Sequence, residues 1–190
     1  PVRGVDDSGK RKYITPEGKS YPSMTTVLSM LSDEGIKQWR LNVGEIQAES
    51  ISRVAKMRGE RIHLLAEKYL LGQIDEYQVL LRKTAPDLIA LWKTLKAHLD
   101  ENVTEVFASE VQMWSDELGI AGTVDLICKY RGKWVVLDFK TSFKEKQREH
   151  ISGYFMQCAG YSKMWQERTG IEIKLIVVLI ATEFLSNTVP

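Results

Sequence analysis

Two carboxylates and one lysine in the second half of the chain have the residue types and the spacing of a metal-dependent phosphodiester site. Asp138 and Lys140 are separated by one residue in an apolar run, so both side chains leave the same face if the run is a β-strand. Asp125 opens the preceding apolar segment, and Arg131 with Gly132 predicts a tight turn that brings the two strands together. Carboxylate oxygens are ligands for Mg²⁺ or Mn²⁺, and a nearby ammonium can stabilise charge on a phosphoryl group. The alternative is a surface salt bridge, because the Asp-x-Lys spacing alone is common.

Two further residues could complete a metal site. His63 is expected on a long helix, just outside the apolar stripe of that helix. Glu67 lies one turn further on and could hold the imidazole ring from behind. Glu110 precedes the strand that begins with Asp125 and could supply another oxygen ligand. The alternatives are a histidine on the surface of a helix and a solvated charge near a turn.

A polar pair follows the lysine strand. Gln157 and Tyr161 are four residues apart on a predicted helix, so they share one face. An amide and a phenol placed in this way can contact a phosphate, a base or the lysine. The alternative is a pair of ordinary boundary residues.

Basic side chains gather in two clusters that flank the proposed metal site. They could follow the backbone of a nucleic acid, or they could be solvated helix faces. We take Arg58 and Lys144 as the candidates for contact with substrate. The clusters consist of Arg53, Lys56, Arg58 and Arg61 before His63, and of Lys140, Lys144, Lys146 and Arg148 after Asp138.

The composition is that of an ordinary globular domain. The 190 residues are 44% hydrophobic and 27% charged with a net charge of +1, so any basic surface must be local. The longest apolar run, from Leu175 to Ala181, has the length of a strand, and we expect no membrane association. Cys128 and Cys158 match no zinc or disulfide spacing and are expected to be buried thiols, which favours a reducing compartment. The chain begins at Pro1, and we expect it to be a trimmed fragment.

The pattern along the chain predicts one α/β domain over residues 1–190. Residues 1–10 are expected to be loose, residues 11–100 mainly helical, and residues 101–190 a β-β-β-α-β core with a mixed sheet flanked by helices. The helix over 49–71 is expected to bury a stripe, Thr84 to cap a helix that begins at Pro86, and the strand over 171–181 to be buried on both faces. The expected stripe consists of Ile51, Val54, Ala55, Ile62, Leu65 and Tyr69.

In combination and order, these residues resemble the signature of the PD-(D/E)XK nuclease superfamily. Within it, the pattern is most similar to the RecB-type exonuclease branch. Tyr21–Leu28, Trp39 and Gly119–Gly122 also resemble segments of the mitochondrial genome maintenance exonucleases and their phage relatives, so the resemblance extends from about Lys12 to Ile180. The motifs that carry it are Gly59-x-x-x-His63, Gly122-Thr123-Val124-Asp125, Leu137-Asp138-Phe139-Lys140-Thr141-Ser142 and Gln157-x-x-x-Tyr161.

The resemblance implies a restriction-endonuclease-like core and metal-dependent cleavage of DNA. By the family pattern, metal would be bound by Asp125, Asp138 and His63, with Glu110 as a further ligand. Lys140 would be catalytic beside both aspartates. Gln157 and Tyr161 would line the site. Val124 stands where the signature has proline, and Asp138 stands where many members have glutamate. Members with an iron–sulfur cluster need four cysteines, so two exclude such a cluster here.

The expected activity is therefore that of a Mg²⁺- or Mn²⁺-dependent DNA exonuclease in replication, recombination or repair, acting on single-stranded ends. The helical half could form an arch over the site that admits a single strand and excludes a duplex. The rivals are a duplex-end recombination exonuclease, a structure-specific endonuclease and an inactive nuclease-like DNA-binding module. We expect an intracellular protein of a bacterial or phage-infected cell, or of the mitochondrial matrix, either a monomer or an oligomer of unknown order.

Overall fold

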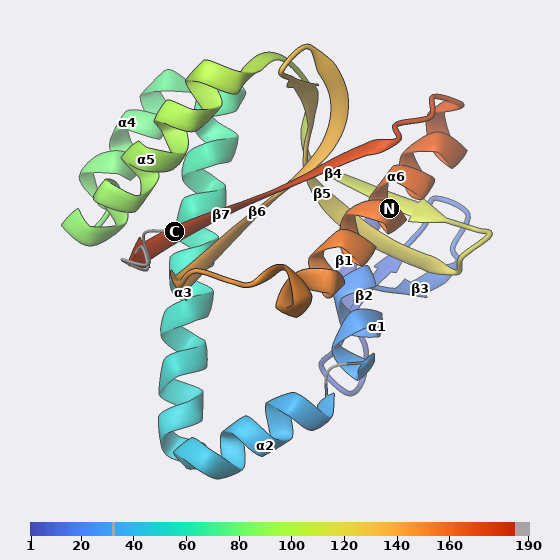
Figure 1. The fold of residues 1–190 in the computed structure, drawn as a ribbon. Coiled ribbons are helices and arrows are strands. Elements are labelled where there is room, and N and C mark those ends of the chain that lie inside the picture. Colours follow the sequence, from blue (N-terminus) through green and yellow to red (C-terminus); the bar gives the residue numbers. More distant parts are fainter. Residues whose placement is uncertain (32, 185–190) are drawn as a thin grey trace.

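The computed structural model describes residues 1–31 and 33–184 and has the α/β architecture expected from the sequence (Figure 1). A four-stranded mixed sheet forms its centre, and helices cover both faces of the sheet. The strands are β1 (Val2–Val5), β2 (Arg11–Ile14), β3 (Ser20–Pro22), β4 (Val103–Ser115), β5 (Ile120–Tyr130), β6 (Lys133–Lys144) and β7 (Leu175–Phe184). The helices are α1 (Met24–Leu31), α2 (Asp33–Val43), α3 (Glu45–Leu70), α4 (Ile74–Arg82), α5 (Pro86–Asn102), the 3₁₀ turn η1 (Arg148–Ile151) and α6 (Ser152–Thr169).

The central sheet has the strand order β4-β5-β6-β7. Its first three strands are antiparallel neighbours, whereas β7 runs parallel to β6. Residues 131 and 132 have φ angles of 49° and 77°, the left-handed values that a two-residue hairpin turn requires. Leu126 pairs with Leu137, so Asp125 and Asp138 lie next to each other beyond that pair. The predicted hairpin is confirmed.

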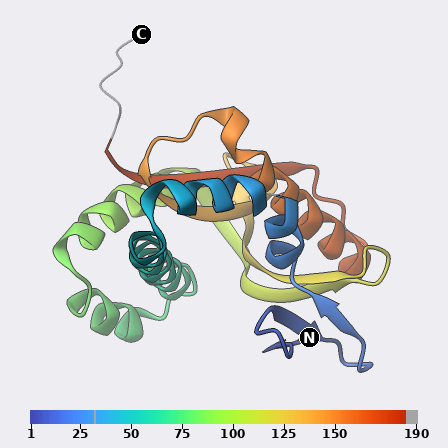
Figure 2. The ribbon, with the colours of Figure 1, turned by 90° about the horizontal axis from the view of Figure 1, so that it is seen from below.

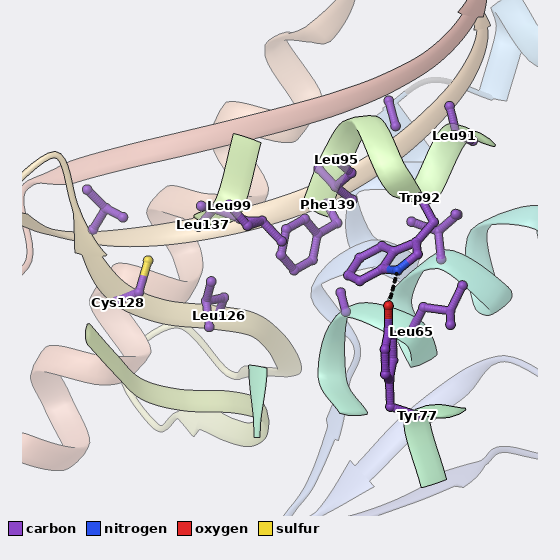
Figure 3. Close-up of a cluster of buried hydrophobic side chains, with 14 residues drawn as sticks. Leu65, Tyr77, Leu91, Trp92, Leu95, Leu99, Leu126, Cys128, Leu137 and Phe139 are labelled. Atoms are coloured by element: carbon purple, nitrogen blue, oxygen red, sulfur yellow. Dashed lines mark hydrogen bonds between the residues drawn. The ribbon is translucent and has the colours of Figure 1, made fainter. Parts of the chain in front are cut away.

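Each face of the sheet has its own hydrophobic core. On one face, α3 and α5 pack against β5 and β6, with α4 alongside them (Figure 3). In this cluster the Trp92 Nε1–H donates to the Tyr77 hydroxyl at 2.9 Å, which satisfies a buried polar group. On the other face, α6 and α1 cover the sheet through residues such as Met164 and Cys158. Because both faces are covered, the central strands hold their side chains in fixed positions.

The N-terminal residues form a small antiparallel sheet with the order β1-β2-β3. β2 and β3 pair as an antiparallel hairpin, and the prediction that residues 1–10 are loose is wrong, since Val2–Val5 pair with β2. The polar composition of residues 1–10 did not indicate that part of this segment is an edge strand. A bridge between Ser23 and Ala121 joins the end of this sheet to β5.

The long helix α3 is buried mainly along its C-terminal half, although Ala48 near its start is also buried. Ile62 and Leu65 lie in the core, but the prediction of a continuous stripe is wrong, since Ile51 is 48% exposed and Val54 is 54% exposed. The N-terminal half of α3 extends beyond the sheet and is joined through α2 to α1, so that the three helices form an arch (Figure 1). Seen from below, α2 crosses from the end of α3 toward α1 (Figure 2). We call α1, α2 and residues 45–58 of α3 the helical arch.

Two smaller predictions are also wrong. Thr84 does not cap α5, because Ala85 occupies the N-cap position and the Thr84 hydroxyl donates to the Leu80 carbonyl at 2.8 Å. The strand predicted over 171–181 begins only at Leu175, which is 45% exposed, although Val177 and Ile176 of β7 pack into the cores on opposite faces of the sheet. Among the described helices, none is long and apolar enough to span a membrane.

Candidate active site

The paired strands β5 and β6 bring the two predicted carboxylates and the lysine together. The backbone N–H of Phe139 donates to Asp125 Oδ2 at 2.7 Å, which fixes the Asp125 side chain against the neighbouring strand. Asp138 is 1% exposed, and the Lys140 ammonium donates to Asp138 Oδ2. Lys140 Nζ also lies 5.2 Å from the ring centroid of Tyr154, which carries it toward α6. The expectation that these three residues share one end of the hairpin is confirmed.

His63 completes this group from α3. Its Nε2 lies 2.9 Å from the Phe139 carbonyl oxygen, so Nε2 carries a proton and donates to that carbonyl. Its Nδ1 lies 3.5 Å from Asp125 Oδ1 and 3.6 Å from Glu110 Oε1. The ring is therefore oriented by a carbonyl of β6, and the predicted partner Glu67 does not hold it. This hydrogen bond leaves Nδ1 aimed at the carboxylates, as a metal-ligating histidine requires.

Glu110 reaches the site through an unusual backbone conformation. Its φ is 52°, in the left-handed region that few residues other than glycine adopt. Ser109 pairs with Leu126 and Val111 with Val124, so Glu110 lies opposite Asp125 on the neighbouring strand. Strained backbone of this kind costs about 1–3 kcal/mol and is concentrated at functional sites. The structure thus brings Glu110 to the other predicted ligands.

The ligand atoms of His63, Glu110 and Asp125 all lie within 4.8 Å of one another. One imidazole nitrogen and two carboxylates suit a divalent cation such as Mg²⁺ or Mn²⁺, with water and substrate oxygens completing the shell. The donor set therefore fits the cofactor that the sequence implied. Asp138 lies outside this group of three, and its oxygens face Lys140 and Gln157 instead.

The helix α6 supplies the predicted polar pair. Gln157 Nε2 donates to Asp138 Oδ1 at 3.0 Å and to the Tyr161 hydroxyl at 3.1 Å. Tyr161 is buried against Gly122, where an added Cβ would lie 2.5 Å from the ring. The absence of a side chain at Gly122 thus allows the tyrosine to approach β5. The pair holds Asp138 in place from the side opposite Lys140.

Burial and crowding of charge perturb the titration of the site. Burial alone would lower the pKa of His63, but Asp125 and Glu110 raise it to about 10. Burial and the adjacent Asp125 raise the pKa of Asp138 to about 7, although Lys140 acts in the opposite direction. Burial would also raise the pKa of Asp125, yet His63 and Lys140 keep it below its ordinary value. The negative charge of the site is thus balanced in part by a proton on His63, which a bound cation would replace.

The site opens into a cavity of about 620 Å³, which we call the site cavity. His63, Glu110, Asp125 and Lys140 are among its lining residues. Arg3 and Arg11 from the N-terminal sheet line it as well, and the motifs did not single them out. No local sequence signal marks these arginines, because only the docking of the small sheet places them there.

The two basic residues predicted to contact substrate, Arg58 and Lys144, lie outside the site cavity. Arg58 and Lys144 line a neighbouring cavity of about 740 Å³ between α3 and the end of β6, and Tyr154 also borders it. We call this the α3–β6 cavity. Arg58 forms an ion pair with Glu183 of β7, whereas Lys144 is exposed. The two basic residues are therefore beside the site and do not enter it.

A mixed sheet flanked by helices, with acidic residues and a lysine at the end of its central hairpin, defines a nuclease-type α/β fold. The family model of the PD-(D/E)XK nuclease superfamily matches residues 37–182. This chain belongs to the PD-(D/E)XK nuclease superfamily. A search of curated proteins finds no match. The match covers α3, the central sheet and α6, and it leaves the N-terminal sheet and α1 outside.

Proposed function

We propose that this nuclease is a Mg²⁺- or Mn²⁺-dependent DNA exonuclease that degrades single strands from their free ends. The observation that carries the proposal is the ligand group of His63, Glu110 and Asp125, which lines one cavity with Lys140, while the buried Asp138 carboxylate accepts from Lys140 behind it. In this proposal the nuclease acts in DNA replication, recombination or repair. The resemblance of the motifs to the RecB-type branch supports the exonuclease assignment within the superfamily.

In this proposal each residue of the site has a distinct role. His63, Glu110 and Asp125 would hold the cation, and Asp138 would hold Lys140 beside it. A bound cation would supply Lewis-acid stabilisation of phosphoryl charge and increase the acidity of water. The Lys140 ammonium, held by Asp138 Oδ2 and 3.4 Å from the Phe139 carbonyl, orients the attacking water and neutralises charge on the phosphoryl oxygens.

Gln157 and Tyr161 act on the same reaction by fixing the Asp138 carboxylate. The amide donates to one carboxylate oxygen of Asp138 while Lys140 donates to the other. Both Asp138 oxygens are therefore occupied before substrate arrives, which limits reorganisation during the reaction. Gln157 and Tyr161 also line the site cavity, where they can contact the strand being cut.

The helical arch supports the preference for a single strand. Thr25 and Gln157 border both the site cavity and a hollow of about 390 Å³ between α1 and α6. Tyr154 borders that hollow and also the α3–β6 cavity, which contains Lys144. Three neighbouring hollows therefore share lining residues from the catalytic group past α1 to α3. In this proposal a flexible single strand follows these hollows beneath the arch, and the stiffer and wider duplex is excluded.

Basic residues on the path support contact with a phosphate backbone. Lys144 and Lys146 line the α3–β6 cavity, and Lys56 lines the site cavity. Arg58 lines the α3–β6 cavity as well but is paired with Glu183, so it contributes most when DNA replaces that partner. Contacts of this type bind DNA without reading its sequence.

The test is digestion of end-labelled linear single strands, blunt duplexes and circular single strands with Mg²⁺ or Mn²⁺ and with EDTA. We expect the linear single strand to be degraded, the circle to survive, and EDTA to stop the reaction. A biotin–streptavidin block on both ends should protect the linear strand as circularisation does. Equal cleavage of circles would indicate an endonuclease, and equal cleavage of duplex ends would indicate a duplex exonuclease; either result would refute the proposal.

The catalytic assignment is tested with Lys140→Ala. Removal of one electrostatic donor to a developing charge costs about 10²–10³ in rate, while binding to DNA should persist. Lys133→Ala is the matched control, because it removes the same charge from the exposed opposite end of β6. If the wild-type protein binds DNA but leaves it intact with either metal, a binding module without catalysis is the better explanation.

A further inference from the structure

The N-terminal sheet presents one face to the site cavity. Arg3 pairs directly with Tyr13 across the β1–β2 ladder, so both side chains lie on the same face. Arg11 is two residues before Tyr13 on β2 and shares that face, whereas Lys12 points the opposite way. Tyr13 is 1% exposed, which shows that this face is turned toward the body of the protein. Both arginines are exposed at its margin and line the site cavity.

The small sheet is held against the catalytic strands at several points. The Tyr13 hydroxyl lies 3.0 Å from Thr123 Oγ1, two residues before Asp125. At the far end, Lys19 and the Tyr21 hydroxyl both donate to Asp116 Oδ1, at 2.7 Å and 2.8 Å. With these contacts the sheet forms a fixed wall of the site, and the arginines keep a defined place beside the metal ligands.

The positive charges of the two arginines are not balanced by ion pairs with the described residues. Over residues 1–31 and 33–184, neither Arg3 nor Arg11 has an ion-pair partner, although Glu110 and Asp125 line the same cavity. Those carboxylates are turned toward His63 instead. A guanidinium offers several N–H donors in a planar fork that matches the oxygens of a phosphate. Two free guanidinium groups at the edge of a nuclease site are therefore suited to bind a phosphate of the substrate strand.

We propose that Arg3 and Arg11 form a phosphate-binding subsite that holds the DNA strand next to the bond being cut. The inference rests on the proposed function, and it adds a substrate contact from a sheet that lies outside the family match over residues 37–182. The bound group is a phosphodiester within the strand or a terminal phosphate at its end. Both present the same oxygens, and the choice between them decides whether the subsite senses the strand or its terminus.

The test compares the double variant Arg3→Gln/Arg11→Gln with Lys12→Gln, a control that removes one charge from the other face of the same strand. Affinity for fluorescent single strands is measured in EDTA over a range of salt concentrations. Each lost phosphate contact should reduce the magnitude of the negative slope of log K (the binding constant) against log salt by about 0.7. The slope of the double variant should therefore be smaller by about 1.4, and the variant should bind about 25-fold more weakly at 0.1 M salt. Lys12→Gln should match the wild type, and all three proteins should unfold at similar temperatures because the replaced side chains are not buried.

Strands with a 5′-phosphate, a 3′-phosphate or no terminal phosphate separate the two sources. Loss of affinity confined to one phosphorylated end identifies a terminal subsite, and equal loss on all three identifies an internal phosphodiester. If the double variant keeps the wild-type slope and affinity, the subsite is refuted, while degradation of single strands by the wild type would leave the exonuclease proposal intact. If the wild-type protein neither binds nor cuts single strands, both proposals are refuted.

Discussion

Replacement of Gly122 by alanine is expected to disturb the site without removing any polar group from it. The new Cβ would lie 2.5 Å from Tyr161 Cε1 and 3.2 Å from the Tyr161 hydroxyl oxygen. Unstrained carbon contacts are about 3.5–4.0 Å, so the ring must move by about 1 Å. Tyr161 is buried and cannot swing into solvent, and its hydroxyl is already 3.1 Å from Gln157 Nε2. A shift of that size breaks the hydrogen bond that helps to fix Gln157 against Asp138.

The cost can be bounded from these contacts. Overpacking of a filled core costs about 1–3 kcal/mol, which for a chain of this length corresponds to a decrease in Tm of roughly 2–12 °C. We expect Gly122→Ala to show this loss in thermal unfolding together with slower cleavage of single-stranded DNA. Gly153→Ala is the matched control in α6, since nothing lies within 4 Å of its added Cβ and alanine favours a helix. It should be neutral or stabilising by up to about 1 kcal/mol.

A double-mutant cycle separates the clash from other effects of the substitution. In a Tyr161→Leu background the ring is gone, so addition of Gly122→Ala should cost less than about 0.5 kcal/mol. A Gly122→Ala protein with wild-type stability and activity would refute the account of close packing at β5. An equal cost in both backgrounds would refute the assignment of that cost to Tyr161.

Three further predictions concern titration and burial. Because the pKa of His63 is raised from 6.5 to about 10, the stabilising contribution of His63 in the metal-free protein is complete below pH 6.5 and lost as the pH rises through 10. Urea unfolding in EDTA should show this decline in the free energy of unfolding. A decline of the same size in His63→Ala would contradict the prediction. Burial raises the pKa of Cys128 and Cys158 to about 12, so both thiols should resist iodoacetamide at pH 8 until the protein is unfolded, as mass spectrometry can show. Tyr77→Phe removes the acceptor of the Trp92 Nε1–H and should cost about 1–3 kcal/mol in chemical denaturation, and an unchanged midpoint would argue against that hydrogen bond.

The parts of the site that local sequence determines were predictable. The alternation around Asp138 and Lys140 and the glycine at position 132 specify a hairpin, because strand side chains alternate and a tight turn needs left-handed φ values. The same holds for Gln157 and Tyr161, whose spacing places them on one face of any helix. The buried thiols Cys128 and Cys158 also lie where their apolar neighbours indicate.

Periodicity failed where burial depends on distant elements. Ile51 and Val54 continue the apolar stripe of α3, yet they are exposed because the part of α3 that packs into the core against the sheet begins at Ile62. The same repeat leads into the core at Ile62, where β6 and α5 cover it. An amphipathic pattern shows which face a helix would bury, but it does not show along how much of the helix other elements pack on that face.

Tertiary structure alone decided how the site is completed and bounded. Glu110 became part of the ligand group through a left-handed backbone conformation in β4, and Arg3 and Arg11 reached the site cavity through docking of the N-terminal sheet. The sequence by itself determined the hairpin and the helix faces, because these follow from interactions between residues a few positions apart, and the order of its motifs indicated the nuclease superfamily. Contacts between elements far apart in the chain depend on the packing of the whole domain, and so the neighbours of the metal ligands could be found only in three dimensions.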